Sequence, residues 1–287
     1  MVSDADLQAL HRRAFAVAYR MLGSVVEAED ISQEALLRLT GLEEDPEEPA
    51  AWVTTVATRL SIDHLRLARV RREAYVGPWL PEPLVVDSAP GPAEQTELAD
   101  EVSQALLVAL EQLTPLERAA FVLHEVFDYD YARIAQVVER SEASCRQLVS
   151  RAKRHLRADR PRFDADPAHG QALLERFLVA AEDGDLAALE EMLADDVVLY
   201  GDGGGKVKTA TQPVAGAAAV ARFLIAVARA RRELGEFELQ LVRVNGQPGR
   251  VLRDAEHRVW DVLSIDVTGG RIGAVRIVRN PDKLRHL

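Results

Sequence analysis

Two short basic segments of an otherwise acidic chain carry the side chains best suited to bind a polyanion. Acidic residues outnumber Lys and Arg by 46 to 35, so the formal charge is -11. Ala132–Arg162, however, holds nine basic and three acidic residues, and Arg59–Glu73 holds five arginines and two acids. Phosphate neutralisation supplies most non-specific affinity for nucleic acid. The overall charge therefore predicts weak DNA binding by the chain alone and stronger binding as a subunit of a larger assembly.

The second basic segment has the pattern of a helix-turn-helix. Helices are predicted over 131–138 and 142–157, and Ser141 is suited to cap the second of them. Apolar residues at helical spacing predict the inner faces of both helices. They are Ile134, Ala135, Val138, Cys145, Leu148, Val149 and Ala152. The predicted outer face of the second helix carries Arg146, Gln147, Ser150, Arg151 and Arg154. Such side chains hydrogen-bond base edges and phosphates in a major groove. A solvated basic face is the alternative interpretation.

Catalytic and metal chemistry have less support in the sequence. No two of the seven histidines have metal-ligand spacing, and the single cysteine, Cys145, excludes an intramolecular disulfide. We predict no cofactor, no metal and no enzymatic activity, and a reducing cytoplasm as the location. No apolar run approaches the roughly 20 residues that cross a bilayer, so a membrane partner is not expected. The glycine-rich loop Gly201–Lys206 has two interpretations. Its backbone is suited to approach an anion or a partner chain, and the alternative is a plain turn with exposed charges.

The elements that must position these residues fall into three parts. Helical periodicity covers the first 76 residues, and five prolines between Pro78 and Pro92 predict a linker. Further along, Thr114–Glu117 has the pattern of a capping box that begins a helix. Helices are expected to resume near Glu97. The predicted domains are 1–76, a linker over 77–96, 97–160 and 167–287. The last should be α+β, with helices near 171–183, 186–193 and 215–233 and strands near 197–200, 237–244, 259–267 and 272–278.

The helix-turn-helix segment resembles region four of extracytoplasmic-function sigma factors. The resemblance lies in Tyr131–Ala135, Ser141–Leu148 and Ser150–Arg154. It implies recognition of the minus-35 promoter element and contact with the beta flap of RNA polymerase. The usual turn glycine is replaced by Glu139 or Arg140, which leaves the turn geometry open.

The N-terminal helices resemble region two of the same family. Ala28–Glu34 is similar to the segment that docks on the beta-prime clamp of core polymerase, which implies polymerase-binding roles for Asp30, Gln33 and Glu34. Ala51–Val53 and Arg59–Arg66 resemble the helix that holds the melted minus-10 element. The residues implied there are Trp52, Arg59, Asp63 and Arg66. Aromatic and arginine side chains suit single-stranded bases, although Trp52 is equally suited to a core.

Three pentapeptides, Trp79–Pro83, Asp202–Lys206 and Asn280–Leu284, resemble the signatures of one subgroup of these sigma factors. That subgroup carries a SnoaL-like C-terminal extension, a curved sheet and helices around a pocket. The resemblance implies that the extension packs near the linker and regulates the two DNA-reading domains, and that its pocket has room for an unknown small ligand. The implied regulatory contacts are Trp79, Pro81, Glu82, Asp202, Lys206, Asn280, Pro281, Asp282 and Lys283.

The favoured hypothesis is a multidomain protein with two all-α sigma domains and an α+β SnoaL-like (NTF2-like) domain. It would direct core RNA polymerase to promoter DNA under the control of its own C-terminal domain. One alternative is a polymerase-independent helix-turn-helix regulator with a ligand-sensing cone, which the acidic total charge disfavours. The other is a SnoaL-like enzyme fused to a DNA-binding region.

Overall fold

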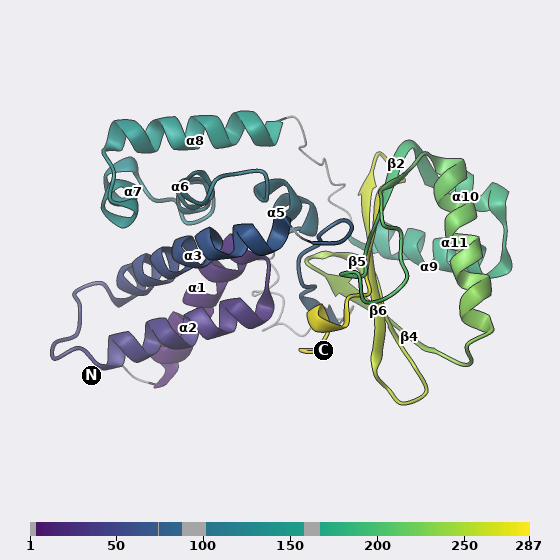
Figure 1. Ribbon diagram of the computed structural model, residues 1–287, viewed down its shortest axis with the longest axis horizontal. Helices are drawn as coiled ribbons and strands as arrows, with labels where there is room; N and C mark the ends of the chain where they lie inside the picture. Colours follow the sequence, from purple (N-terminus) through teal and green to yellow (C-terminus); the bar gives the residue numbers. More distant parts are fainter. Residues whose placement is uncertain (1–3, 74, 88–101, 158–166) are drawn as a thin grey trace. The chain divides into compact units, whose positions relative to one another are not determined.

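The computed structural model describes residues 4–73, 75–87, 102–157 and 167–287. The chain divides into two compact units. Residues 1–74 and 105–160 form the first, called here the helical unit, and residues 75–104 and 161–287 form the second, called here the C-terminal unit. Figure 1 shows the helices of the former and the sheet of the latter. The linker segment, defined as residues 75–87, thus belongs to the C-terminal unit.

The helical unit begins with three helices, α1 (Asp4–Leu22), α2 (Val25–Thr40) and α3 (Pro49–Glu73). Ser24 begins α2 by accepting a hydrogen bond from the Glu27 amide on its hydroxyl at 3.2 Å. Their apolar faces meet in a core that includes Met21, Ile31 and Val53, all at most 8% exposed. The helical periodicity of this part of the sequence is confirmed by these elements.

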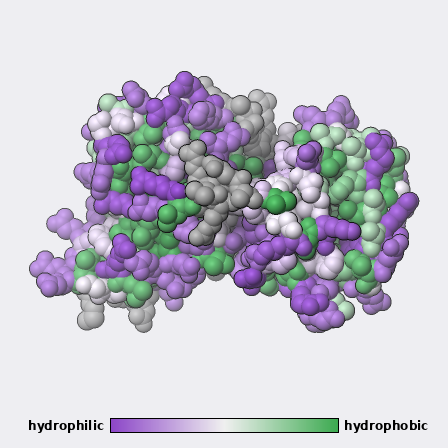
Figure 2. Space-filling model, viewed as in Figure 1, coloured by the Kyte–Doolittle hydropathy of each residue, from purple (hydrophilic) through white to green (hydrophobic). Residues whose placement is uncertain are grey.

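The described residues of the helical unit hold four further helices: α5 (Gln104–Leu110), α6 (Pro115–Glu125), α7 (Tyr131–Val138) and α8 (Glu142–Arg157). The predicted capping box is confirmed, because the Thr114 hydroxyl accepts from the Glu117 amide while the Glu117 carboxylate accepts from the Thr114 amide. The helix start expected near Glu97 lies outside the described residues. Figure 2 shows hydrophilic residues interspersed with hydrophobic ones over the visible face of this unit, at left.

The C-terminal unit packs three helices, α9 (Pro167–Asp183), α10 (Leu186–Met192) and α11 (Ala217–Arg232), on one face of a mixed sheet. In its described residues the sheet order is β1-β4-β5-β6-β7-β2-β3. The strands are β1 (Val85–Asp87), β2 (Leu193–Asp202), β3 (Val214–Ala215), β4 (Glu238–Val244), β5 (Gln247–Arg253), β6 (Val259–Thr268) and β7 (Arg271–Val278). Neighbouring strands pair antiparallel except β2 and β7, which run parallel.

Both faces of this sheet carry buried apolar side chains. Leu263, Ile265 and Ile277 point to the helices and join the main core of the unit. The register places Val262 opposite Val278 on the other face, and both are 1% exposed. Leu80 of the linker segment and Leu284 of the tail are also buried, at 1% and 5%.

The structure corrects several expected boundaries in this unit. Ala215, predicted as the start of a helix, lies in β3, because Val214–Ala215 pairs with Val198–Leu199; α11 begins only after Gly216, whose φ is +89°. Strand β2 is longer than the four residues expected. The strands β1 and β5 were not predicted, and β1 shows that the proline-rich linker contributes an edge strand to the sheet.

Candidate nucleic-acid interface and linker-binding site

The residues proposed for the minus-35 element share the outer face of α8. Arg146, Gln147, Ser150, Arg151 and Arg154 are all exposed. On the opposite side of the helix, Cys145, Leu148 and Val149 are buried at 5% exposure or less. The geometry has the side chains and the exposure that a recognition helix needs.

The turn before α8 replaces the usual glycine with a strained residue. Glu139 has φ +55° and ψ +52°, the left-handed conformation, and its amide donates to the Ala135 carbonyl. Ser141 then accepts from the Ser144 amide at 3.2 Å, as an N-cap does. A left-handed residue other than Gly or Asn is uncommon, so Glu139 carries the turn at a conformational cost.

Glu117 orients one of the proposed DNA-binding arginines. Its carboxylate, 7% exposed, accepts from Arg151 Nε at 2.8 Å. Burial raises the pKa of Glu117, but the hydrogen bonds from Thr114 and Arg151 outweigh burial and lower it below the ordinary value. Arg151 is therefore pre-positioned by α6, whereas Arg154 has no hydrogen bond or ion pair with the described part of the chain.

The proposed minus-10 residues lie along α3 but are not equivalent. Trp52 is partly buried, and Asp63 and Arg66 form an exposed ion pair with each other at 3.1 Å. Arg59 instead reaches α7: its Nε donates to the Val137 carbonyl at 3.0 Å and its Nη2 to the Gln136 carbonyl at 2.9 Å.

The proposed polymerase-binding residues lie on α2. Asp30 and Gln33 are exposed, and Glu34 pairs with Arg38 at 2.7 Å. Leu37, 68% exposed, lies on the same helix. A single exposed leucine among charged side chains is common on protein surfaces, so the docking role of this face stays a prediction.

Asp202 binds the linker segment from the end of β2, and it is fully buried. Its Oδ2 accepts from the Leu80 amide at 2.8 Å and from Lys283 Nζ at 2.8 Å. Its Oδ1 accepts from the Tyr75 hydroxyl at 2.5 Å and from the Gly204 amide at 3.1 Å. Both oxygens of one carboxylate thus hold two donors each, and two of the four donors come from the linker segment.

Lys283 completes this site from the C-terminal tail. Its side chain is 8% exposed, and besides Asp202 it donates to the Leu80 carbonyl. The ammonium nitrogen lies 4.2 Å from the Trp79 ring centroid and 4.9 Å from that of Tyr75. A buried cation with a carboxylate, a carbonyl and two ring faces is well compensated for its desolvation.

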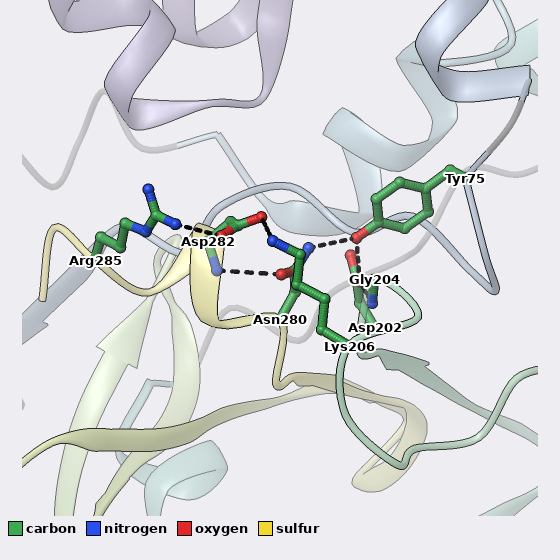
Figure 3. Close-up of polar contacts among 7 residues, drawn as sticks. All are labelled: Tyr75, Asp202, Gly204, Lys206, Asn280, Asp282 and Arg285. Atoms are coloured by element: carbon green, nitrogen blue, oxygen red, sulfur yellow. Dashed lines mark hydrogen bonds and ion pairs between the residues drawn. The ribbon is translucent and has the colours of Figure 1, made fainter.

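The remaining residues of the tail and the glycine loop bind one another. Asn280 Nδ2 donates to the Tyr75 hydroxyl at 2.8 Å, and its Oδ1 accepts from the Asp282 amide. Figure 3 shows Asp202 and Asn280 converging on Tyr75, and Asp282 between Lys206 and Arg285, with both of which it forms ion pairs. Pro281 begins the short 3-10 helix η1 (Pro281–Lys283). Pro81 and Glu82 are buried.

Two residues of this site, Tyr75 and Asn245, were not predicted from the sequence. Tyr75 lies just before the predicted linker, and burial followed by the hydrogen bond to Asp202 raises its pKa, which keeps the hydroxyl protonated as a donor. Asn245, in the β4–β5 turn, accepts from the Leu84 amide at 3.2 Å and donates to the Val102 carbonyl at 3.1 Å. The Asn-Gly dipeptide signals the turn but not these contacts.

In the part of the chain that the structure describes, no three His, Cys, Asp or Glu side chains gather as a metal site. None of the described helices is long and apolar enough to span a membrane.

The fold and the exposed basic face of α8 are those of a helix-turn-helix module, the class of fold that many DNA-binding proteins share. Comparison with known proteins narrows the class. Residues 7–71 match the family model for sigma-70 region 2, and residues 103–156 match that for sigma-70 region 4.

Relatives extend the match to the whole chain. The ECF RNA polymerase sigma factor SigJ of Mycobacterium tuberculosis is 38% identical over 97% of this chain and 92% of its own length. The probable ECF sigma factor SigI of the same species is 33% identical over 95% of this chain and 92% of its own length. The crystal structure of SigJ superposes with a TM-score of 0.77 at 35% identity, covering 98% of both chains.

The chain belongs to the extracytoplasmic-function sigma factors of RNA polymerase. The predicted family and the sigma-factor function in transcription initiation are confirmed by these comparisons. The predicted fold class, two helical sigma domains followed by an α+β domain, is confirmed by the match to the SigJ structure. Core RNA polymerase and promoter DNA are its partners. The polymerase-independent regulator is not favoured.

Proposed function

We propose that the C-terminal unit regulates this sigma factor by binding the linker segment between its two promoter-reading domains. The observation that carries the proposal is the buried Asp202 carboxylate, which accepts hydrogen bonds from the Tyr75 hydroxyl and the Leu80 amide. Strand β1 adds main-chain pairing with β4 from Val85 to Asp87. A linker held in this way has its length and direction fixed, so it limits the placements available to the domains it joins.

Covalent attachment makes such regulation effective without a separate inhibitor. A tethered domain has a high effective concentration, so contacts of modest strength maintain the bound state. The site combines buried hydrogen bonds, one ion pair and a short strand pairing, which together can be released as a unit. A ligand or partner would shift the balance only by binding the two states with different affinity.

The remaining assignments belong to the same proposal. In it, α2 docks on the beta-prime clamp through Asp30, Gln33 and Glu34, α3 holds the minus-10 strand, and α8 reads the minus-35 element while its domain contacts the beta flap. The C-terminal unit acts as a regulator and not as an enzyme, with the cytoplasm as its place of action. The domain limits 1–76, 77–96, 97–160 and 167–287 remain predictions.

In vitro transcription with core polymerase tests the regulatory role on the full chain. The test variant is Lys283→Met, which keeps an unbranched side chain but removes the ammonium from Asp202. The matched control is Arg285→Met, in the same tail, 73% exposed and bonded to Asp282 outside the buried site. We expect Lys283→Met to release the linker and raise promoter-dependent transcription, and Arg285→Met to behave as the unaltered chain.

Two further chains, ending after Arg279 and after Asp166, separate the tail from the whole unit. Equal transcription by Lys283→Met, Arg285→Met and the unaltered chain would refute regulation through this site. A fall in transcription specific to Lys283→Met would show that the bound linker is needed for activity. Core polymerase without any added sigma factor gives the baseline, and the transcription that each chain supports is measured above that baseline.

A further inference from the structure

Three arginines gather at one end of the sheet face that packs against the helices of the C-terminal unit. Arg250 on β5 pairs in register with Leu263, which belongs to the core beneath the helices, and Asp261 lies two residues from Leu263 on the same strand. Side chains two residues apart share a sheet face, so Arg250 and Asp261 both point to the helix side.

The other two arginines approach the same place from β7 and α11. Val278 pairs with Val262, which places Arg279, one residue further, opposite Asp261. The pKa of Arg279 is lowered by burial and raised in part by the Asp261 charge. Arg231 comes from the last turn of α11, on the helix layer that covers this face (Figure 1).

The charges of this arginine cluster do not balance. Arg250 and Asp261 form a buried ion pair, with side chains 7% and 6% exposed. Arg231, 17% exposed, pairs with Glu182, which it shares with the more exposed Arg232. The three arginines of the cluster thus face two carboxylates, Asp261 and Glu182, and Glu182 is shared with Arg232. Burial and then the charge of Arg250 lower the pKa of Arg231, so the cluster repels itself as it stands.

Buried hydrogen-bond donors of the cluster are also unused. The Nε atoms of Arg250 and Arg279 are buried and have no hydrogen-bond partner within the described residues. A buried donor without an acceptor is costly, more so on a charged group. Arg250 as a whole is 5% exposed, so bulk water does not compensate it. An anion that accepted from these groups would remove both the missing hydrogen bonds and the excess charge.

Two aromatic rings border the cluster. The register of β5 with β6 shifts beside Trp260, which is therefore the extra residue of a β-bulge, a feature often found near functional sites. The Arg279 guanidinium lies 4.7 Å from the Trp260 ring centroid and that of Arg231 5.9 Å from the Phe237 centroid. The two rings meet edge to face at 5.2 Å.

We infer that this cluster binds a small organic anion, with a carboxylate, sulfonate or phosphate group on an aromatic or apolar body. The guanidinium groups bind the anionic group, since arginine presents its donors in a fork that suits such oxygens. Trp260, Phe237 and the neighbouring apolar core contact the body. The bound anion would lie inside the C-terminal unit, which is the regulatory domain in the proposed function.

The position of Arg279 gives the site a route to the linker. The next residue, Asn280, points to the opposite side and bonds the Tyr75 hydroxyl, and the amides of both Arg279 and Asn280 donate to the Asp202 carbonyl, at 2.7 and 2.9 Å. A ligand that engages Arg279 therefore acts one residue from the linker-binding site. This consequence rests on the proposed function, whereas the binding itself does not.

A pair of fluorescent probes tests the site on the full chain without polymerase. The anionic probe is 8-anilinonaphthalene-1-sulfonate, and the matched neutral probe is N-phenyl-1-naphthylamine, which has the same rings without the sulfonate. We expect the sulfonate to bind at least about 10-fold more tightly, as a charge-assisted hydrogen bond in a desolvated site implies.

Three arginine variants locate the binding. Arg231→Gln and Arg279→Gln should each weaken sulfonate binding about 10-fold and leave the neutral probe unchanged. Arg232→Gln is the control: it neighbours Arg231, shares Glu182, and its side chain is 57% exposed. Cooperative thermal unfolding of every variant shows that the probe reports on folded protein, and Arg231→Gln, the substitution on the more exposed side, keeps the test valid if Arg279→Gln does not fold.

Equal affinity for the two probes, or no binding of either, would overturn the inference. So would unaltered sulfonate binding by Arg231→Gln, or an equal loss in Arg232→Gln, since both would indicate surface charge alone. None of these results depends on transcription. A failure here leaves regulation through Asp202 and Lys283 untouched, and a failure of the transcription experiment leaves the anion site untouched.

Discussion

Substitution of Asp202 by Asn should release the linker segment, because no orientation of an amide can replace this carboxylate. Oδ2 accepts from the Leu80 amide and Lys283, and Oδ1 accepts from the Tyr75 hydroxyl and the Gly204 amide. The amide NH₂ group would face two donors in either orientation. The Tyr75 hydroxyl can turn to accept, but the Gly204 amide, the Leu80 amide and the Lys283 ammonium cannot.

The expected cost follows from the bonds lost. A hydrogen bond to a charged group contributes about 1.5–3 kcal/mol, and one partner of a buried ion pair left alone costs about 3–5 kcal/mol. These contributions overlap, because Lys283 belongs to both. We expect Asp202→Asn to lower the free energy of unfolding of the C-terminal unit by about 3–5 kcal/mol, measured as a shift of the urea midpoint at unchanged slope.

Hydrogen exchange distinguishes local release from general weakening. The Leu80 amide donates to Asp202, so peptides covering residues 75–86 should lose protection in Asp202→Asn. Asp266→Asn is the control, because Asp266 forms a similar buried pair with Arg276 on β6 and β7, 2.5 Å apart and each 7% exposed. It should destabilise the same unit while the linker peptides stay protected relative to the rest. A cost below about 1 kcal/mol for Asp202→Asn, or equal linker protection in both variants, would refute the reasoning.

Three further outcomes concern the helical unit. Arg154→Ala should weaken binding of holoenzyme to minus-35 DNA by about 1–3 kcal/mol and relax specificity at one base; unchanged affinity in an electrophoretic titration would remove it from recognition. Folding lowers the pKa of Glu117, so the ionised carboxylate stabilises the folded state by about 1 kcal/mol. This contribution is present above about pH 4.3 and is lost as pH falls through the pKa of the folded state. The urea midpoint of Glu117→Gln should lack this acid dependence. Replacing Asp30 and Gln33 by Ala should reduce recovery of core polymerase in a pull-down, with Glu44→Ala in the exposed acidic loop as the control.

The helical unit could be predicted almost element by element because its signals are local. Apolar spacing sets each helix, and Thr114 and Ser141 mark two of the starts through contacts within three residues. The exposed face of α8 follows from the same spacing. The left-handed turn residue could not be chosen between Glu139 and Arg140 from the sequence, since neither type favours that conformation and tertiary packing decides.

The linker-binding site could be predicted only in part, because its bonds join distant parts of the chain. The three pentapeptides brought Asp202, Asn280 and Lys283 to attention by resemblance. Tyr75 carries no such signal, and its partner lies 127 residues away. Strand β1 was missed for a related reason: Val85–Asp87 follows prolines and has no pattern of its own, and it is a strand because the edge of β4 is available to pair with it.

Arg59 on α3 contacts the end of α7 within the helical unit. Its guanidinium donates to the carbonyls of Gln136 and Val137 and pairs with Glu139 at 3.1 Å. The last carbonyls of a helix attract cations. In the proposed minus-10 role, Arg59 has to release these groups before its guanidinium can bind a base of the melted strand. With Arg59 47% exposed, solvent screening limits the contact to about 1 kcal/mol, which lowers apparent DNA affinity by a factor of about five.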